Sequence, residues 1–330
     1  MTSKRKGIWP ALVLFFLAPA IGELLSGSSP PAEFFNPFGL LVMAALYGSG
    51  EILVRELRVR WDKGWPTVFA LGAAYGIVEE GLMVKSFFDP NWMDLGLLGT
   101  YGRWAGVNWV WSLNLTIYHA VVSIAIPILL VELLFPAQRD ERWVGRRGMI
   151  GLSLLLLADV LLGFFLLTLY RPPFVPYLLA IIVTVALFLA ARRLPVREGV
   201  MPPVRVPRPL WFALVGFVAQ FVFFFGIFWG LPEFGIPVPL TMLAAVALVA
   251  LVAWGVQRMS RGGAWNDEHR LALAGGVLMF FVLIAPLQEL DETRVDNTTG
   301  MMLVGLVTFL FLLWLWRRVR AASKNPPLAF

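Results

Sequence analysis

Long apolar runs separated by short polar segments form the main pattern of this sequence. A helix needs about 20 mostly apolar residues to cross the roughly 30 Å hydrocarbon core of a bilayer, and each run is close to that length. The pattern therefore predicts an all-α, polytopic membrane helix bundle with about ten transmembrane helices. The runs cover about residues 8–26, 37–57, 65–87, 107–135, 148–170, 174–192, 210–230, 236–257, 271–290 and 301–317.

If successive loops lie on opposite sides of the membrane, the Lys and Arg residues are distributed unevenly between the two sides. One side receives 22 of the 27 Lys and Arg residues and the other receives 4, while Arg55 lies inside the second run. Loops on the cytoplasmic side of a membrane carry an excess of these residues. We therefore expect a multi-pass protein of the cell membrane whose N- and C-termini are both cytoplasmic.

The composition excludes a soluble globular domain. Hydrophobic residues make up 59% of the 330 residues, charged residues make up 15%, and the mean hydropathy is +0.76. The lipid bilayer is therefore the expected partner. The net charge of +6 comes largely from basic residues in the loops, so we expect no nucleic-acid partner.

The lack of cysteine and the presence of only two histidines, His119 and His269, limit the chemistry. The chain can form no disulfide, no thiol nucleophile and no Cys-ligated metal site, and a site built on several imidazoles is excluded. A carboxylate-rich metal site is compatible with the composition, but no motif assigns a metal. We expect no cofactor.

A basic, proline-rich segment divides the runs into two groups. Residues 193–209 read "RLPVREGVMPPVRVPRP" and are expected to form a cytoplasmic loop. The sequence before this loop, residues 1–192, predicts a six-helix membrane module, and the sequence after it, residues 210–330, predicts a four-helix membrane module.

Two adjacent carboxylates, Glu79 and Glu80, lie inside the third apolar run. If that run leads outward, Glu79 is roughly 12 Å below the outer surface at 1.5 Å per residue, and His119 in the fourth run is roughly 18 Å below it. Asn114 lies on the same run as His119, nearer its outer end. Because these depths are similar, we expect the four side chains to form a polar intramembrane site that opens to the outer side.

The acid pair has a structural and a functional interpretation. A carboxylate near the middle of a bilayer is unfavourable by at least ~2.5 kcal/mol on insertion scales, so such groups are paired, hidden or functional. In the structural interpretation, the two glutamates pair with Lys85, Arg55 or hydrogen-bonding side chains and hold helices together. In the functional interpretation, they form a reactive site with His119 and Asn114.

Other polar residues are candidates for binding a substrate. Asp159 falls near the middle of the fifth run, where it cannot reach water by itself. The longest external segment, which joins the third and fourth runs, offers Asp89, Asn91 and Arg103 among aromatic residues. This mixture suits a lid over the site or the recognition of a polar headgroup.

One short internal repeat is present. The second and third runs share the pattern Tyr-Gly-x-x-Glu, which ends at Glu51 in "YGSGE" and at Glu79 in "YGIVE". The two helices run antiparallel, so the repeat does not place equal residues at equal depths. We interpret it as small-residue helix packing, in which glycines let backbones approach closely.

The pair Glu79-Glu80, followed by His119 in the next helix, resembles the first two motifs of the CAAX-protease and bacteriocin-processing superfamily of intramembrane glutamate proteases. The resemblance covers about residues 71–123. It implies that Glu79 or Glu80 activates water that attacks a peptide bond. If the protein is such an enzyme, we expect His119 with Asn114 to stabilise the oxyanion.

The sequence departs from that family's pattern at several positions. The family has an arginine four residues after the second glutamate, where this chain has Val84 and then Lys85. Leu115 stands where the family has an aromatic residue, four positions before the histidine. A later histidine motif has no counterpart, because the next histidine, His269, is expected in a polar loop.

The residues alone leave three functional classes open. The first is a membrane-embedded hydrolase of the glutamate-protease type, acting on a membrane-embedded peptide or lipid. The second is a carrier of a small solute or ion, in which the same acids bind a proton or cation near mid-membrane. The third is a non-catalytic membrane scaffold, which needs only polar contacts between helices.

Overall fold

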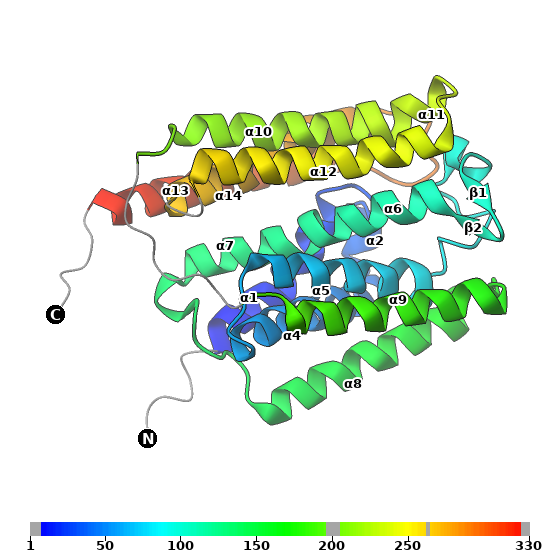
Figure 1. Ribbon diagram of the computed structural model, residues 1–330, viewed down its shortest axis with the longest axis horizontal. Helices are drawn as coiled ribbons and strands as arrows, with labels where there is room; N and C mark the ends of the chain where they lie inside the picture. Colours follow the sequence, from blue (N-terminus) through cyan, green and yellow to red (C-terminus); the bar gives the residue numbers. More distant parts are fainter. Residues whose placement is uncertain (1–7, 196–204, 262–264, 325–330) are drawn as a thin grey trace.

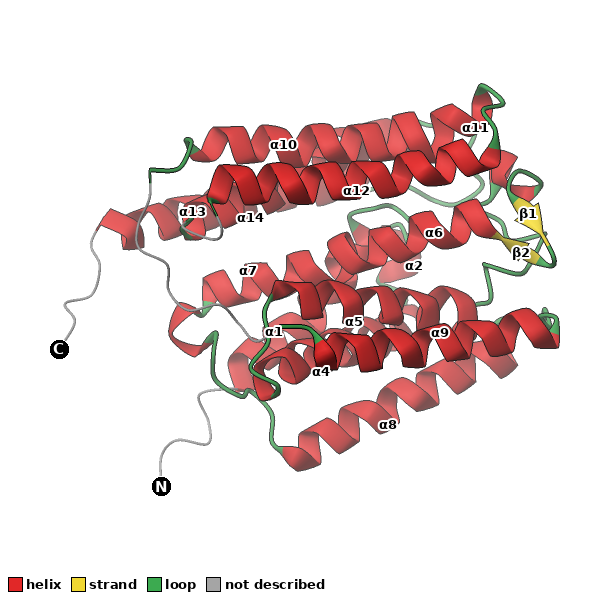
Figure 2. Ribbon diagram, in the orientation of Figure 1, coloured by secondary structure: helices red, strands yellow, loops and turns green. Residues whose placement is uncertain are grey.

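The computed structural model describes residues 8–195, 205–261 and 265–324, and helices dominate these residues (Figure 2). The first six predicted runs contain α1 (Ile8–Pro19), η2 (Ala20–Leu24), α3 (Pro37–Met43), η3 (Ala44–Gly48), α4 (Ser49–Arg60), α5 (Trp65–Ile77), η4 (Val78–Met83), α6 (Trp109–Tyr118), η6 (His119–Ala125), α7 (Ile126–Leu134), α8 (Arg146–Leu162), η8 (Gly163–Leu167) and α9 (Phe174–Arg193). The last four contain α10 (Pro209–Phe221), η9 (Val222–Gly230), α11 (Leu231–Glu233), α12 (Val238–Ser260), α13 (Asp267–Glu289) and α14 (Met301–Lys324).

Short elements occur only between these helices within the described residues. They are α2 (Pro31–Phe34), η5 (Gly96–Gly99), η7 (Pro136–Gln138) and the hairpin strands β1 (Arg103–Trp104) and β2 (Val107–Asn108). The two strands pair antiparallel, with Arg103 opposite Asn108 and Trp104 opposite Val107.

The prediction of a polytopic helical membrane protein is confirmed. Eight helices in the described part of the chain are long and apolar enough to cross a membrane, and Ile8–Leu24 is a shorter apolar helix. The third predicted run is helical as well, and it carries the two glutamates that make it less apolar than the others. Every predicted run therefore corresponds to a helix.

Side-chain caps set where several helices begin. The side chain of Asn36 accepts hydrogen bonds from the amides of Phe38 and Gly39 at the start of α3, and Asn108 accepts one from Trp111 at the start of α6. Such caps satisfy amides that have no partner within the helix. Asn108 thus fixes the point at which the chain leaves the hairpin and enters the helix that carries His119.

The helices are arranged in two groups along the long axis of the molecule (Figure 1). One group contains α10, α12, α13 and α14, the other contains α1, α4, α5, α8 and α9, and α6 and α7 run between them. One end of the bundle carries the hairpin of β1 and β2, and we call it the hairpin end. The opposite end carries the arginine-rich loops, and we call it the basic end.

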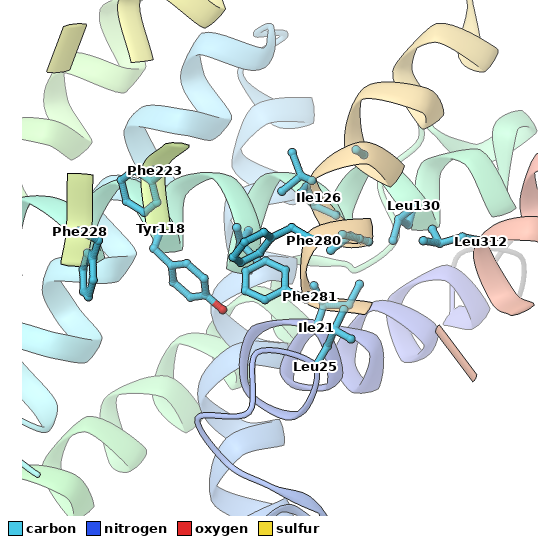
Figure 3. Packing of buried hydrophobic residues seen from close by; sticks show 14 of the residues in the cluster. Ile21, Leu25, Tyr118, Ile126, Leu130, Phe223, Phe228, Phe280, Phe281 and Leu312 are labelled. Carbon is cyan, nitrogen blue, oxygen red and sulfur yellow. The ribbon is translucent and has the colours of Figure 1, made fainter. Parts of the chain in front are cut away.

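An aromatic core joins the two groups (Figure 3). The ring of Tyr118 on α6 packs edge-on against Phe224 of η9 and Phe281 of α13, with centroids 6.1 Å and 6.2 Å apart. By contrast, α8, α9 and α12 bury only 11%, 6% and 11% of their most apolar stretches. These three helices therefore present the apolar surface that a bilayer would cover.

The predicted boundary between two modules stays a prediction. Of the basic loop at residues 193–209, residues 196–204 lie outside the described part of the chain, as do residues 1–7. An ion pair at the basic end links the groups, because Arg139 after η7 donates to the carboxylate of Asp267 on α13 at 2.5–3.0 Å. The described chain enters α1 and leaves α14 at this same end (Figure 1).

Candidate functional site

Five polar side chains converge in the half of the bundle nearer the hairpin end, and each comes from a π-helical segment. Glu23 lies in η2, Tyr47 in η3, Glu79 and Glu80 in η4, and His119 opens η6. A π-helical turn contains an extra residue, and such turns occur frequently at functional sites. We call these five residues the acid cluster.

The imidazole of His119 lies between the carboxylates of Glu79 and Glu80. Its Nδ1 is 3.3 Å from Oε2 of Glu79, and its Nε2 is 3.1 Å from Oε1 of Glu80. Glu79 and His119 are only 4% and 2% exposed. The ring can therefore interact with both acids at once, although adjacent helical residues point in directions about 100° apart.

Tyr47 joins a third carboxyl group to this arrangement. Its hydroxyl lies 2.5 Å from Oε1 of Glu79 and also contacts Oε1 of Glu23. The hydroxyl of Ser29 donates to the other oxygen of Glu23 at 2.9 Å. The first three membrane helices thus meet at one hydrogen-bonded group.

Glu80 has its own supporting contacts. The hydroxyl of Ser86 donates to Oε2 of Glu80, and the indole nitrogen of Trp111 donates to Ser86 at 3.0 Å. The side chain of Glu80 is 14% exposed, compared with 6% for Glu79. Glu80 is therefore the better solvated carboxylate of the pair, and its orientation is fixed from two sides.

Glycines make room for the rings of the site. A Cβ atom at Gly22 would lie 2.6 Å from Cε1 of Tyr47, and a Cβ atom at Gly76 would lie 2.8 Å from the Cβ of His119. Both separations are too short for a side chain, so any other residue would push a ring away. The close packing expected from the small residues in these runs agrees with this geometry.

Three buried polar side chains on the helices that carry the cluster have atoms without a hydrogen-bond partner among the described residues. Asn114 is 1% exposed, and neither its amide oxygen nor its amide nitrogen is bonded. Both carboxylate oxygens of Glu51 and the hydroxyl of Ser123 also have no partner. Buried polar groups usually have partners, so unpaired ones are candidates for contact with a ligand or water.

Lys85 and Arg55, the two basic residues that the structural interpretation pairs with the acids, contact other groups instead. Lys85 is fully buried, but its Nζ donates to the carbonyls of Phe164 and Thr168, both at 2.8 Å. Arg55 pairs with Glu56 at the basic end of α4. Among the residues that the structure describes, no lysine or arginine forms an ion pair with the acid cluster.

The other predicted site residues lie apart from the cluster. Asp159 on α8 is 5% exposed, and its Oδ2 has no described partner. Arg103 donates to the carbonyls of Phe88, Asp89 and Gly99, and the carboxylate of Asp89 accepts from the amide of Asn91. These contacts shape the hairpin loop, and a role in substrate binding for these residues stays a prediction.

Three residues of the acid cluster could offer ligands to a metal ion. Glu79, Glu80 and His119 each offer a ligand atom, and these atoms lie within 4.8 Å of one another. The imidazole nitrogens also lie 3.1–3.3 Å from the carboxylate oxygens, a separation that suits proton exchange between the ring and the acids. The arrangement is that of an imidazole held between two acids, which is suited to proton transfer.

Sequence reasoning brought Glu79, Glu80 and His119 together but did not place Tyr47 and Glu23 in the site. The internal repeat was the available signal, since Tyr47 begins its first copy and Glu79 ends its second. The structure connects these two residues directly. Because the two helices run antiparallel, the first residue of one repeat copy lies beside the last residue of the other copy. Aligning the two copies residue by residue does not show this contact.

Comparisons with known proteins identify relatives of this chain. A family model described as "Uncharacterized membrane protein family" matches residues 12–329. A curated protein of Archaeoglobus fulgidus, described as "Uncharacterized protein", is 24% identical over 125 residues. That match covers 38% of this chain and 38% of the length of the relative. No solved structure matches this chain.

Proposed function

We propose that this chain, which belongs to that uncharacterized membrane protein family, is a membrane-embedded hydrolase in which the acid cluster activates water. One observation carries the proposal: a buried imidazole lies within 3.3 Å of two carboxylates, and no described lysine or arginine pairs with them. A set of acids that only held helices together would be expected to have basic partners. An acid–base site needs carboxylates that can gain and lose a proton.

Each residue has a role that follows from its surroundings. Glu80 is the general base, because it is the more exposed carboxylate and because Ser86 and His119 orient it. It removes a proton from water as the water attacks a substrate carbonyl carbon, and that proton then passes to the leaving group. Asn114 donates its unpaired amide N–H to the developing oxyanion.

The substrate is a membrane-embedded peptide or lipid with a hydrolysable carbonyl. The site lies among transmembrane helices, and His119 follows the start of α6 by ten residues, which is roughly 15 Å along a helix. A soluble polymer cannot reach that depth without entering the bilayer. A segment that spans the bilayer can present a bond there.

The test uses purified protein in lipid vesicles with a library of single-span peptides. Cleavage is detected by mass spectrometry in water enriched in ¹⁸O, because attack by water places one ¹⁸O atom in each new carboxyl group. We expect labelled products from the wild type and a rate at least about 100-fold lower for Glu80→Gln. Tyr118→Phe serves as a control, because this buried hydroxyl donates to the carbonyl of Gly22 and has no hydrogen bond to a carboxylate among the described residues.

Two outcomes would overturn the proposal. One is the absence of ¹⁸O-labelled products from peptides and from ester-linked lipids under the same conditions. The other is a cleavage rate that Glu80→Gln and Glu79→Gln leave unchanged. A chelator supplies a further check: the proposal assigns the activation of water to Glu80 and not to a bound metal ion, so the rate should not fall on its addition.

A further inference from the structure

A hydrogen count at Tyr47 shows that the acid cluster shares a proton. The hydroxyl of Tyr47 contacts Oε1 of both Glu23 and Glu79. A phenol has one proton and can donate it to only one of these oxygens. The second contact is favourable only if the other carboxyl group has a proton of its own and donates it to the oxygen of Tyr47. The geometry is the one expected when one of the two glutamates is neutral.

The number of acids around the site supports the same interpretation. Four carboxyl groups, those of Glu23, Glu51, Glu79 and Glu80, interact electrostatically in this region, and the imidazole of His119 is the basic group that faces them among the described residues. Fully ionised, they would leave several buried negative charges unbalanced. Buried groups avoid that state by binding protons.

Of the two carboxyl groups that contact Tyr47, that of Glu23 lies nearer to water. It is half-buried in the last turn before the loop at the hairpin end, and the exposed Ser28 follows closely in that loop. Ser29 donates to its carboxylate at 2.9 Å. Glu79, by comparison, is 4% exposed and lies on the far side of Tyr47.

We propose that Tyr47 and Glu23 form a proton-transfer branch that connects Glu79 with the water at the hairpin end. In one transfer, Glu79 gives its carboxyl proton to the oxygen of Tyr47 while the hydroxyl proton of Tyr47 moves to the carboxylate of Glu23. Tyr47 is neutral before and after, and the net change is one proton moved from Glu79 to Glu23. The reverse transfer reloads Glu79.

The branch adds a proton-transfer route to the proposed hydrolase site. Its role in turnover therefore rests on the proposed function. It sets whether Glu79 is charged, and Glu79 shares His119 with the general base Glu80. When Glu79 is neutral, Glu80 is the charged carboxylate of the pair beside the imidazole. Tyr47 and Glu23 are positioning residues in this scheme, because they act on the reaction through Glu79.

Other groups that face the branch contribute to its proton affinity. The ring of Tyr47 lies 5.8 Å from that of Tyr75 and 6.4 Å from that of His119, measured between centroids. Glu51 on α4 and Glu80 add negative charge. Each is present in every variant proposed below, so differences between variants report on Tyr47 and Glu23.

Infrared spectroscopy of the full chain in lipid vesicles tests the branch without any substrate. Labelling the glutamate side-chain carboxyls with ¹³C separates their carbonyl bands from those of aspartate. We expect a band of protonated glutamate that responds to the pH at the hairpin end. Tyr47→Phe should shift this band and its pH midpoint, and Glu23→Gln should remove or displace it.

Tyr118→Phe is the matched control, because it deletes a buried hydroxyl that donates to the carbonyl of Gly22 at 2.8 Å and contacts no carboxylate. It should leave the band unchanged. In the cleavage assay, Tyr47→Phe should shift the pH–rate profile and lower the rate about 10-fold or more. Tyr118→Phe should do neither.

The results separate this inference from the proposed function. A protonated-glutamate band that neither Tyr47→Phe nor Glu23→Gln alters would overturn the branch, even if Glu80 supports cleavage. A band that both variants alter, in a protein that cleaves nothing, would support the branch and overturn the hydrolase. The cluster would then be a proton-binding site of the kind that a carrier uses.

Discussion

Two buried groups of ionisable residues occur on the same helices, and they differ in how their charges are balanced. At the basic end, Arg55 lies 2.8 Å from Glu56 and 3.7 Å from Glu132, and Arg58 also contacts Glu132. We call these four residues the arginine cluster. In the acid cluster, carboxylates face only a tyrosine, a serine or the imidazole of His119.

The arginine cluster also satisfies the backbone around it. Arg55 donates to the carbonyls of Arg139 and Glu141 at 2.8 Å and 2.6 Å, and its guanidinium lies 3.6 Å from the ring centre of Trp143. A buried charge held by opposite charges and carbonyls stabilises one conformation. A buried acid that contacts only groups able to exchange protons can still gain and lose a proton. The comparison therefore distinguishes a structural site, the arginine cluster, from a reactive one, the acid cluster.

The largest expected effect on stability is at Arg55. Arg55→Met removes the buried cation that Glu56 and Glu132 share and leaves the carbonyl of Glu141 without this donor, and breaking a buried pair in this way costs about 3–5 kcal/mol. Unfolding in detergent, followed by tryptophan fluorescence, measures the loss. Arg146→Met is the control, because Arg146 is exposed at the start of α8 and should change stability little. Equal effects of both substitutions would contradict the structural role of the arginine cluster.

The largest expected effect on turnover after Glu80 is at Asn114. Asn114→Ala removes the proposed oxyanion donor and should lower the cleavage rate by about 10²–10³-fold. The unfolding free energy should not fall, because the amide has no partner to lose in the described structure. A variant that unfolds more easily but cleaves normally would show that Asn114 is a packing residue.

Lys85→Met should have a smaller effect, and only on stability. The ammonium group donates to two carbonyls at the end of the helix that contains η8, and Arg171 donates to the same two oxygens at 3.0 Å and 3.1 Å, so they keep a donor and the loss should cost about 1 kcal/mol. The cleavage rate of the folded protein should be unchanged, because Lys85 contacts no carboxylate of the acid cluster. A large fall in rate at equal stability would mean that Lys85 balances the acids after all.

The smallest expected effect concerns pH at the hairpin end. Arg294 donates to Asp296, which lowers the pKa of that carboxyl group, and Arg294 also donates to the carbonyl of Gly27 at 2.8 Å. Because the pKa is lower in the folded state, this contact stabilises the fold above the unfolded value of about 3.9. The stability is lost as the pH falls through the folded value.

For a partly exposed pair the loss should be less than about 1 kcal/mol. Unfolding of the wild type and of Asp296→Asn, measured at neutral pH and again below the folded pKa of Asp296, should differ only at neutral pH. An equal difference at both values would show that Asp296 acts through something other than its charge.

The fold could be predicted from the sequence because the bilayer allows few solutions. Apolar runs of fixed length read directly as helices, and every predicted run is helical. Part of the site followed from depth alone, since Glu79 and His119 lie at similar depths on consecutive helices. Their mutual contact was therefore expected.

The rest of the site depended on features that a linear pattern does not contain. The π-helical turns rotate Glu23 and Tyr47 relative to an α-helical register, so helical periodicity misplaces them. Arg103 resembled a substrate-binding residue because it is charged and external, but it is occupied by backbone carbonyls. Such contacts between distant segments become visible only in three dimensions.

The contrast between the two clusters can be measured in one experiment. The free energy of unfolding is determined for the double variant Glu79→Gln, Glu80→Gln and compared with that of the wild type. We predict equal or higher stability, because glutamine can still hydrogen-bond with His119 and the repulsion between buried acids is removed; reactive sites are often stabilised when their charges are replaced. A loss of several kcal/mol, comparable to that of Arg55→Met, would show instead that the acid cluster is a structural lock between helices.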